Sequence, residues 1–102
     1  MRTITIDATS WKTVLDFYDA LLPAIGAPPG HGTSIDAFLD SMIWGGMNSV
    51  EPPYTVRIEG TASLPEEVRN EIELLKRELA EARAYVLERE DRQAEVYLET
   101  DV

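Results

Sequence analysis

Three short stretches of the chain alternate apolar and polar residues, which is the pattern of a β-strand with one buried face. They cover residues 2–7, 54–59 and 94–99. Gly60 follows the second stretch and is expected to end it. In a parallel sheet that is covered on both faces the strands are apolar throughout. This alternation therefore predicts strands with one buried face and one solvent-exposed face.

Apolar residues at three- and four-residue spacing predict an amphipathic helix after the first strand. The stripe runs from Trp11 to Ile25, and Pro23 is expected to kink the helix or to end it near Leu22, because proline has no backbone N–H. Side chains that can cap the start of this helix precede the stripe: Asp7, Thr9 and Ser10.

A longer apolar stripe predicts a long helix before the third strand. Ser63 and Glu66 have the spacing of a capping box, and Pro65 suits the first turn. Such a stripe is also compatible with a coiled-coil surface, but one helix has to cover a three-stranded sheet, so we expect it to face the core. Its apolar members are Val68, Ile72, Leu75, Leu79, Ala82 and Val86.

In the middle of the chain a glycine-rich loop precedes a short predicted helix, roughly residues 34–43, which Thr33 or Ser34 can cap. Asp36 and Asp40 stand four residues apart, so both carboxylates project from one side of this helix. Asp36 lies in the first turn, where the helix dipole favours a negative charge. A like-charge pair at this spacing costs about 0.2–0.5 kcal/mol, so local structure does not explain Asp40. The apolar positions of the helix are Ile35, Phe38, Leu39 and Met42.

The predicted order of elements is strand, helix, helix, strand, helix, strand. Helical crossovers between strands imply a parallel sheet, and right-handed crossovers that all pack on one face require the strands to advance in one direction. The sequence therefore predicts a two-layer α/β fold, with a three-stranded parallel sheet in the order 1-2-3 and the helices packed on one face. A length of 102 residues fits a single domain over residues 1–102.

Charge adds more to this picture than composition does. The chain has a net charge of −10, and no lysine or arginine occurs between Lys12 and Arg57. We call residues 13–56 the cation-free stretch. Its field repels nucleic acids and membrane surfaces and attracts basic partners, although acidity can also serve solubility alone. The acids within it are Asp16, Asp19, Asp36, Asp40 and Glu51.

Other features of the sequence bear on the compartment. The chain contains no cysteine, which removes disulfides and thiolate sites and fits a reducing environment. Its first residues contain no long apolar core of a signal peptide, and no apolar run has the length of a membrane span. We therefore expect a cytoplasmic protein that binds neither nucleic acid nor a membrane.

The sequence offers little for catalysis. His31, the only histidine, stands in the glycine-rich loop, and no nucleophile or phosphate-loop motif is present. A small enzyme that uses Asp36 and Asp40 as an acid–base pair is one alternative, but no second functional group accompanies them. We expect no catalytic residue, no cofactor and no metal site. Trp44, beside Gly45, either fills the core under the following loop or is an exposed interface anchor.

The segment Gly30-His31-Gly32-Thr33-Ser34-Ile35-Asp36-Ala37-Phe38-Leu39-Asp40, with Trp44 downstream, resembles the signature of the barstar family, the intracellular inhibitors of secreted ribonucleases. The order of elements in the whole chain also fits that family. The resemblance implies an inhibitor, or immunity protein, whose partner is an extracellular-type, barnase-like ribonuclease. An acidic helix and the preceding loop would occlude the basic active site of that enzyme. We expect the inhibitor to be a monomer.

The resemblance also implies roles for individual residues. Asp36 and Asp40 match the two helix aspartates of the family, and Asp40 matches the one that enters the phosphate site of the enzyme. Gly32 and Ser34 match the loop that lies against the enzyme, and Ile35 matches the adjacent apolar contact. The predicted partner-binding residues are Gly30, His31, Gly32, Thr33, Ser34, Ile35, Asp36, Leu39, Asp40, Trp44 and Gly45.

Some of these positions depart from the family pattern. Gly30 and His31 stand where the family often has tyrosines, and Leu39 stands where an aromatic residue is usual. Trp44 comes one residue early. The alternative function is an acidic protein-interaction module that binds a different basic partner, without any nuclease.

Overall fold

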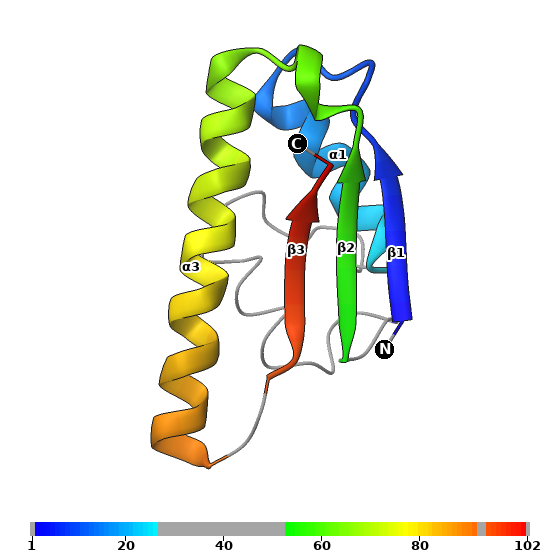
Figure 1. Ribbon diagram of the computed structural model, residues 1–102. Helices are drawn as coiled ribbons and strands as arrows, with labels where there is room; N and C mark the ends of the chain where they lie inside the picture. Colours follow the sequence, from blue (N-terminus) through cyan, green and yellow to red (C-terminus); the bar gives the residue numbers. More distant parts are fainter. Residues whose placement is uncertain (1, 27–52, 92–93, 102) are drawn as a thin grey trace.

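The computed structural model describes residues 2–26, 53–91 and 94–101. Three strands form one sheet. Figure 1 shows a helix behind this sheet and a long helix along one side of it. The elements, in chain order, are β1 (Arg2–Asp7), α1 (Val14–Ala24), β2 (Tyr54–Glu59), the 3-10 helix η1 (Thr61–Ser63), α3 (Glu66–Glu90) and β3 (Val96–Thr100).

The sheet is parallel throughout, and its strand order is β1-β2-β3, which confirms the predicted topology. Ile4 of β1 is aligned with Val56 of β2, and Val56 is aligned with Leu98 of β3. These apolar side chains come from one set of alternating positions, and the same positions on β2 and β3 are buried. The fold is therefore an α/β arrangement of two layers, and the alternation in the sequence indicated which face of each strand is covered.

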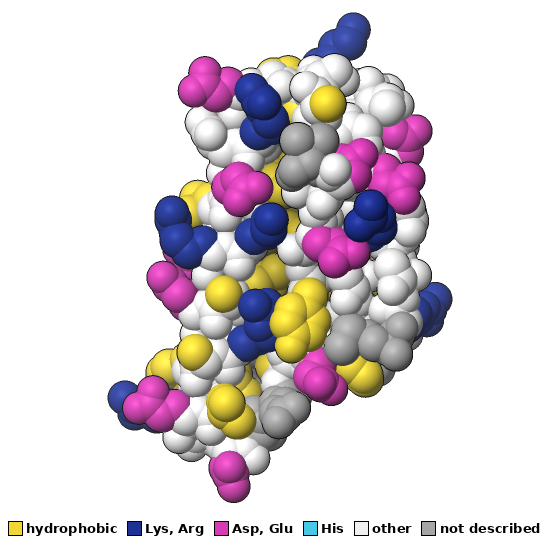
Figure 2. Space-filling view, viewed as in Figure 1, with side chains coloured by type: hydrophobic (Ala, Val, Ile, Leu, Met, Phe, Trp, Pro, Cys, Tyr) yellow, Lys and Arg dark blue, Asp and Glu magenta, His cyan; other side chains and the backbone are white. Residues whose placement is uncertain are grey.

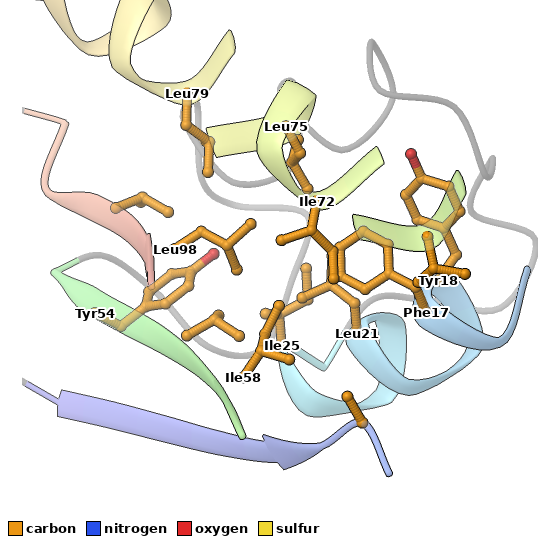
Figure 3. Packing of buried hydrophobic residues seen from close by; sticks show 14 of the residues in the cluster. Phe17, Tyr18, Leu21, Ile25, Tyr54, Ile58, Ile72, Leu75, Leu79 and Leu98 are labelled. Atoms are coloured by element: carbon orange, nitrogen blue, oxygen red, sulfur yellow. The ribbon is translucent and has the colours of Figure 1, made fainter. Parts of the chain in front are cut away.

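The core forms where the inner face of β2 meets both helices. Tyr54, Val56 and Ile58 of β2 are fully buried. The side chains that close over this face come from α1 and α3 (Figure 3). Fully burying one such side chain contributes about 1.5–3 kcal/mol, so this contact dominates the stability of the fold. The fully buried helix residues include Phe17, Leu21, Leu75 and Leu79.

The opposite face of the sheet is polar, as the alternation predicts. Arg57 lies at its centre, with Glu99 of β3 at 3.2 Å and Glu59 at 3.4 Å from its guanidinium nitrogens. All three side chains are substantially exposed, so these ion pairs contribute little to stability. They place one base between two acids on this face of an acidic protein.

Helix α1 begins later than the sequence suggested. Its N-cap is Thr13, whose Oγ1 accepts a hydrogen bond from the Asp16 N–H at 3.2 Å. The carboxylate of Asp16 accepts in return from the Thr13 N–H at 3.1 Å, which completes a capping box. The expected caps at residues 7–10 are therefore wrong. Trp11 precedes the helix and is buried, with its ring centroid 5.5 Å from that of Phe17.

The end of α1 also differs from the prediction. The helix continues through Pro23 to Ala24, two residues beyond the expected end. A proline in the last turn removes one hydrogen bond and leaves the preceding turns intact, so the helix tolerates it there. The chain then turns at Gly26, which has a left-handed φ of 68°.

Helix α3 carries the predicted stripe but not the predicted cap. Ser63 lies in η1, and the N-cap of α3 is Pro65, which has no side-chain cap hydrogen bond. The expected box between Ser63 and Glu66 is therefore wrong. Glu66 and Glu67 still favour the first turn, because they face the positive end of the helix dipole. The stripe faces the core at Val68, Ile72, Leu75, Leu79 and Val86, with Ala82 partly buried.

Asp101, which follows β3, ties that strand to the turn after β2. Its carboxylate accepts hydrogen bonds from the Gly60 N–H at 2.7 Å, the Thr61 N–H at 3.2 Å and the Thr61 hydroxyl at 2.6 Å. The Thr61 hydroxyl, followed by the backbone donors, lowers the pKa of Asp101 to about 2.

The third strand begins at Val96, two residues after the predicted start at Ala94, and it ends at Thr100.

We predict that Leu79→Ala lowers the free energy of unfolding by about 2–5 kcal/mol, because it leaves a cavity in the core. Leu79 is 0% exposed, whereas Leu87 on the same helix is 51% exposed. Leu87→Ala is therefore the matched control, with an expected change within about 0.5 kcal/mol. Urea unfolding followed by circular dichroism measures both. Equal losses in the two variants would contradict the assignment of the core face of α3.

We predict that the stabilising contribution of Asp101 is present above about pH 4 and is lost as the pH falls towards 2, because the pKa of Asp101 in the fold lies at about 2, below its ordinary value of 3.8. Asp101→Ala should therefore lower the urea midpoint at pH 7, and the gap to the wild type should close near pH 2. Asp19→Ala, an exposed change on α1, serves as the control. A gap that is constant across this range would contradict the assignment.

Candidate functional site

The predicted partner-binding residues all lie in a single segment outside the described residues. This holds for Gly30, His31, Gly32, Thr33, Ser34, Ile35, Asp36, Leu39, Asp40, Trp44 and Gly45, and for the short helix expected over residues 34–43. The structure describes the scaffold to which that segment is attached, namely the sheet and its two helices. Residues 27–52 connect the end of α1 to the start of β2.

The two ends of this connection are firmly held. On one side, Ile25 is fully buried and its N–H donates to the Leu21 carbonyl at 3.2 Å. The Gly26 N–H donates to the Pro23 carbonyl at 3.1 Å. On the other side, Tyr54 is fully buried and its N–H donates to the Glu95 carbonyl at 3.0 Å. The segment therefore starts and finishes at backbone fixed by the core.

The described end of α1 is electrostatically negative. Its last turn contains no basic residue, so the partial negative charge of the helix C-terminus is not balanced there. The cation-free stretch continues on both sides of this end. The chain therefore enters residues 27–52 from a negative helix terminus.

One acid of the cation-free stretch has a structural role. Hydrogen bonds from the backbone N–H groups of Lys12 and Thr13 lower the pKa of Asp16, because they stabilise its charged form. Asp16 is therefore a capping residue rather than a group directed at a partner, which the sequence pattern alone did not distinguish. Asp19, three residues on, is exposed on the surface of α1.

A hydrogen bond between side chains joins the two described helices. The Tyr18 hydroxyl on α1 donates to Oε2 of Glu71 on α3. Burial, followed by the Glu71 carboxylate, raises the pKa of Tyr18. Sequence periodicity placed Tyr18 on the buried face of its helix, but nothing in the sequence indicated its partner 53 residues away. This bond helps to fix the orientation of α1, and hence the point from which residues 27–52 depart.

A shallow hollow of about 190 Å³ lies between the second half of α3 and β3, at residues that the sequence analysis did not single out. The Arg83 guanidinium stands 4.4 Å from the centre of the Tyr97 ring and donates to the Val96 carbonyl at 2.8 Å. Leu87 and Tyr97 are exposed hydrophobic side chains that line it. Figure 2 shows hydrophobic side chains exposed among charged ones on the side of the molecule that carries α3 and β3. The one sequence signal was an aromatic residue at a polar position of the third strand.

A second hollow, of about 210 Å³, lies near the start of α3 and the end of β3. Its charged groups are Arg69 and Glu73, and the rest of its lining is Thr61, Leu64, Ile72 and Thr100. The Thr61 hydroxyl is already bonded to Asp101. Neither hollow brings together a nucleophile and a general base of the kind that a reaction class requires.

Within residues 2–26, 53–91 and 94–101, no cluster of three or more histidine, aspartate or glutamate side chains is placed to hold a metal ion. None of the helices in these ranges combines the length and the apolar character needed to cross a membrane.

We predict that Tyr18→Phe lowers the free energy of unfolding by about 0.5–1.5 kcal/mol, because it removes one hydrogen bond and retains the buried ring. Glu71→Gln retains the shape of the partner and removes its charge. In a double-mutant cycle the two changes should couple, since Tyr18→Phe removes the donor and Glu71→Gln weakens the acceptor of the same hydrogen bond. Strictly additive effects in urea unfolding would show that the Tyr18–Glu71 contact does not join the helices in solution.

The comparisons with known proteins bear on the whole chain. A family model described as Barstar (barnase inhibitor) matches residues 1–99, a range that includes every described element except the last residue of β3, and the whole of the 27–52 connection. No curated protein matches the chain. The resemblance first suggested by residues 30–40 and Trp44 therefore extends over almost the full length.

Proposed function

We propose that this chain, which belongs to the barstar family, inhibits a barnase-type ribonuclease by occluding the basic active site of the enzyme with residues 30–45. The observation that carries the proposal is the family match over residues 1–99, a family described by its inhibition of barnase. The cation-free stretch supports it independently, because the residues proposed to meet a basic surface lie in the part of the chain without lysine or arginine.

The physical basis is charge complementarity. A ribonuclease active site has to hold phosphate and to stabilise negative charge in the transition state, so it is basic. Carboxylates fixed on a helix can take the positions of phosphate groups and prevent RNA from entering. Complementary charge also steers the two proteins together, and the barnase–barstar pair is itself a standard example of such steering.

In this proposal Asp40 enters the phosphate site of the enzyme and Asp36 supports it from the same side of the predicted helix. Gly32, Ser34 and Ile35 lie against the enzyme in the preceding loop and first turn. The wider set comprises Gly30, His31, Thr33, Leu39, Trp44 and Gly45. The residues at positions 30, 31 and 39 replace aromatic side chains that the family often uses, so the cognate enzyme is expected to offer a differently shaped apolar surface.

The described scaffold suits this role in two respects. The negative end of α1 leads directly into the proposed binding segment, so it adds to the attraction for a basic partner. The buried residues on both sides of the segment give it a rigid base, which reduces the ordering that binding requires. We place the inhibitor in the cytoplasm, as a monomer without a cofactor, where it would protect the cell from its own ribonuclease before secretion.

We predict that Asp40→Ala weakens inhibition of a purified barnase-type ribonuclease by about 30-fold or more, because truncating one partner of a buried charge pair costs about 2–5 kcal/mol. RNA hydrolysis at increasing inhibitor concentration gives the inhibition constant. Asp19→Ala removes the same charge from an exposed position on α1 and should leave that constant within about threefold.

Two outcomes would count against this assignment. Undiminished inhibition by Asp40→Ala would exclude Asp40 from the contact. A nucleotide that occupies the active site should compete with the inhibitor, and a complex insensitive to it would indicate that the acidic surface binds elsewhere. High salt does not discriminate, since it slows the association of any acidic protein with a basic partner.

A further inference from the structure

β1 is an outer strand of the sheet, and one of its two edges has no described neighbour. The strand order is β1-β2-β3, so β1 pairs with β2 alone. Helix α3 lies alongside β3, the other outer strand, whereas none of the described helices and strands lies beyond β1 (Figure 1). A strand edge of this kind presents backbone N–H and C=O groups to which a further strand can bond.

The backbone groups on this free edge of β1 belong to Thr3, Thr5 and Asp7. The Ala8 N–H donates to the Glu59 carbonyl of β2 at 2.8 Å. Successive residues of a strand direct their backbone groups to opposite sides, so the even-numbered residues of β1 face β2 and the odd-numbered residues face away from it. The side chains of the three odd-numbered residues are exposed on the polar face of the sheet.

The inner face of β1 is incompletely covered as well. Ile4 and Ile6 are only partly buried, whereas Val56 and Ile58, the residues of β2 with which they are aligned, are fully buried. Apolar surface therefore remains on the strand that has the free edge. A further strand at this edge would cover part of that surface, which is favourable.

We propose that the free edge of β1 binds β1 of a second copy of the chain, in antiparallel orientation and with the two-fold axis at Thr5. In this register Thr5 lies opposite Thr5 of the second copy, and Thr3 lies opposite Asp7 of the second copy. All of these residues direct their backbone groups across the free edge, so opposite residues exchange N–H···O=C hydrogen bonds. The two sheets would join into one.

The side chains are complementary in the same register. On the polar face Thr5 meets Thr5, and the Thr3 hydroxyl can donate to the Asp7 carboxylate of the second copy. On the inner face Ile4 lies opposite Ile6 of the second copy, which brings the partly buried side chains together. Pairs of these kinds stabilise antiparallel strands. Every pair joins two odd-numbered or two even-numbered residues, so the helices of both copies stay on one face of the joined sheet.

The size and the charge of the two copies make this dimer weak. β1 has six residues, compared with about 20–30 residues on each side of a standard interface. Each copy also has a net charge of −10, so the copies repel each other. We therefore expect a monomer at the low concentrations of an inhibition assay and a dimer at high concentration. Salt should strengthen the dimer, because it screens the repulsion.

The test is sedimentation equilibrium of the free, full-length protein, without any ribonuclease, up to about 1 mM and at low and high salt. Thr3→Lys and Thr5→Lys are matched variants, because they make the same change of charge at two exposed positions of one strand. At a single salt concentration, Thr5→Lys should weaken the dimer about threefold or more, since two like charges then lie opposite each other. Thr3→Lys should strengthen it about threefold or more, since the lysine meets Asp7 of the second copy.

A mixture tests the position of the two-fold axis. Thr5→Glu alone should weaken the dimer as Thr5→Lys does, and an equimolar mixture of the two variants should restore it, because unlike charges then meet. Circular dichroism and the urea midpoint show that each variant is folded. If Thr5→Lys does not fold, Thr5→Glu alone provides the same test against Thr3→Lys.

Several results would overturn the inference. A wild-type protein that stays monomeric up to about 1 mM in high salt would exclude the dimer. A dimer that Thr5→Lys and Thr3→Lys change in the same direction would show that net charge, and not this register, controls it. A mixture of the Thr5 variants that dimerises no better than either one would exclude the two-fold axis at Thr5. No ribonuclease takes part, so a failure of the proposed function would leave these results unchanged.

Discussion

The inner face of β2 is the contact on which the described fold depends. Its three buried side chains, Tyr54, Val56 and Ile58, meet both helices, and each neighbouring strand takes its register from the same strand. Moving β2 by one residue would turn these side chains to the polar face and bring Arg57 into the core. The register of the sheet and the positions of α1 and α3 are thus specified together by one strand.

This arrangement separates stability from recognition. The buried residues lie on helices and strands whose ends are held by backbone hydrogen bonds. The acids proposed to face the enzyme lie instead in the connection between α1 and β2. Of the two acids of the cation-free stretch that lie among the described residues, Asp16 and Asp19, it is Asp16 that caps α1. Substitutions in the proposed binding segment can therefore leave intact the core that carries it.

The sequence allowed the fold to be predicted to a large extent, because alternation and three-to-four spacing are local properties of strands and helices. It did not allow the helix starts to be predicted. Thr9, Ser10 and Thr13 are chemically similar caps, and Thr13 is used because Trp11 must first reach the core beside Phe17. Likewise, Leu64 is buried ahead of α3, so the helix starts after Pro65 and Ser63 is left in η1. Such choices depend on packing between distant residues, which periodicity does not contain.

For the candidate site, the family pattern predicted the partner-binding residues. The contacts that hold the scaffold beneath them join residues far apart in the chain, and the sequence did not indicate these contacts. The bond between Tyr18 and Glu71, and the capping role of Asp16, had no sequence signature that separated them from surface charges. The hydrogen bond from Arg83 to the Val96 carbonyl likewise had no sequence signature, and it protects one edge of the sheet. β3 is an edge strand, and an exposed edge is a template on which a second chain can add a strand. An incoming strand would have to displace the Arg83 guanidinium from both the Val96 carbonyl oxygen and the Tyr97 ring, so this contact disfavours the addition of a second chain at that edge.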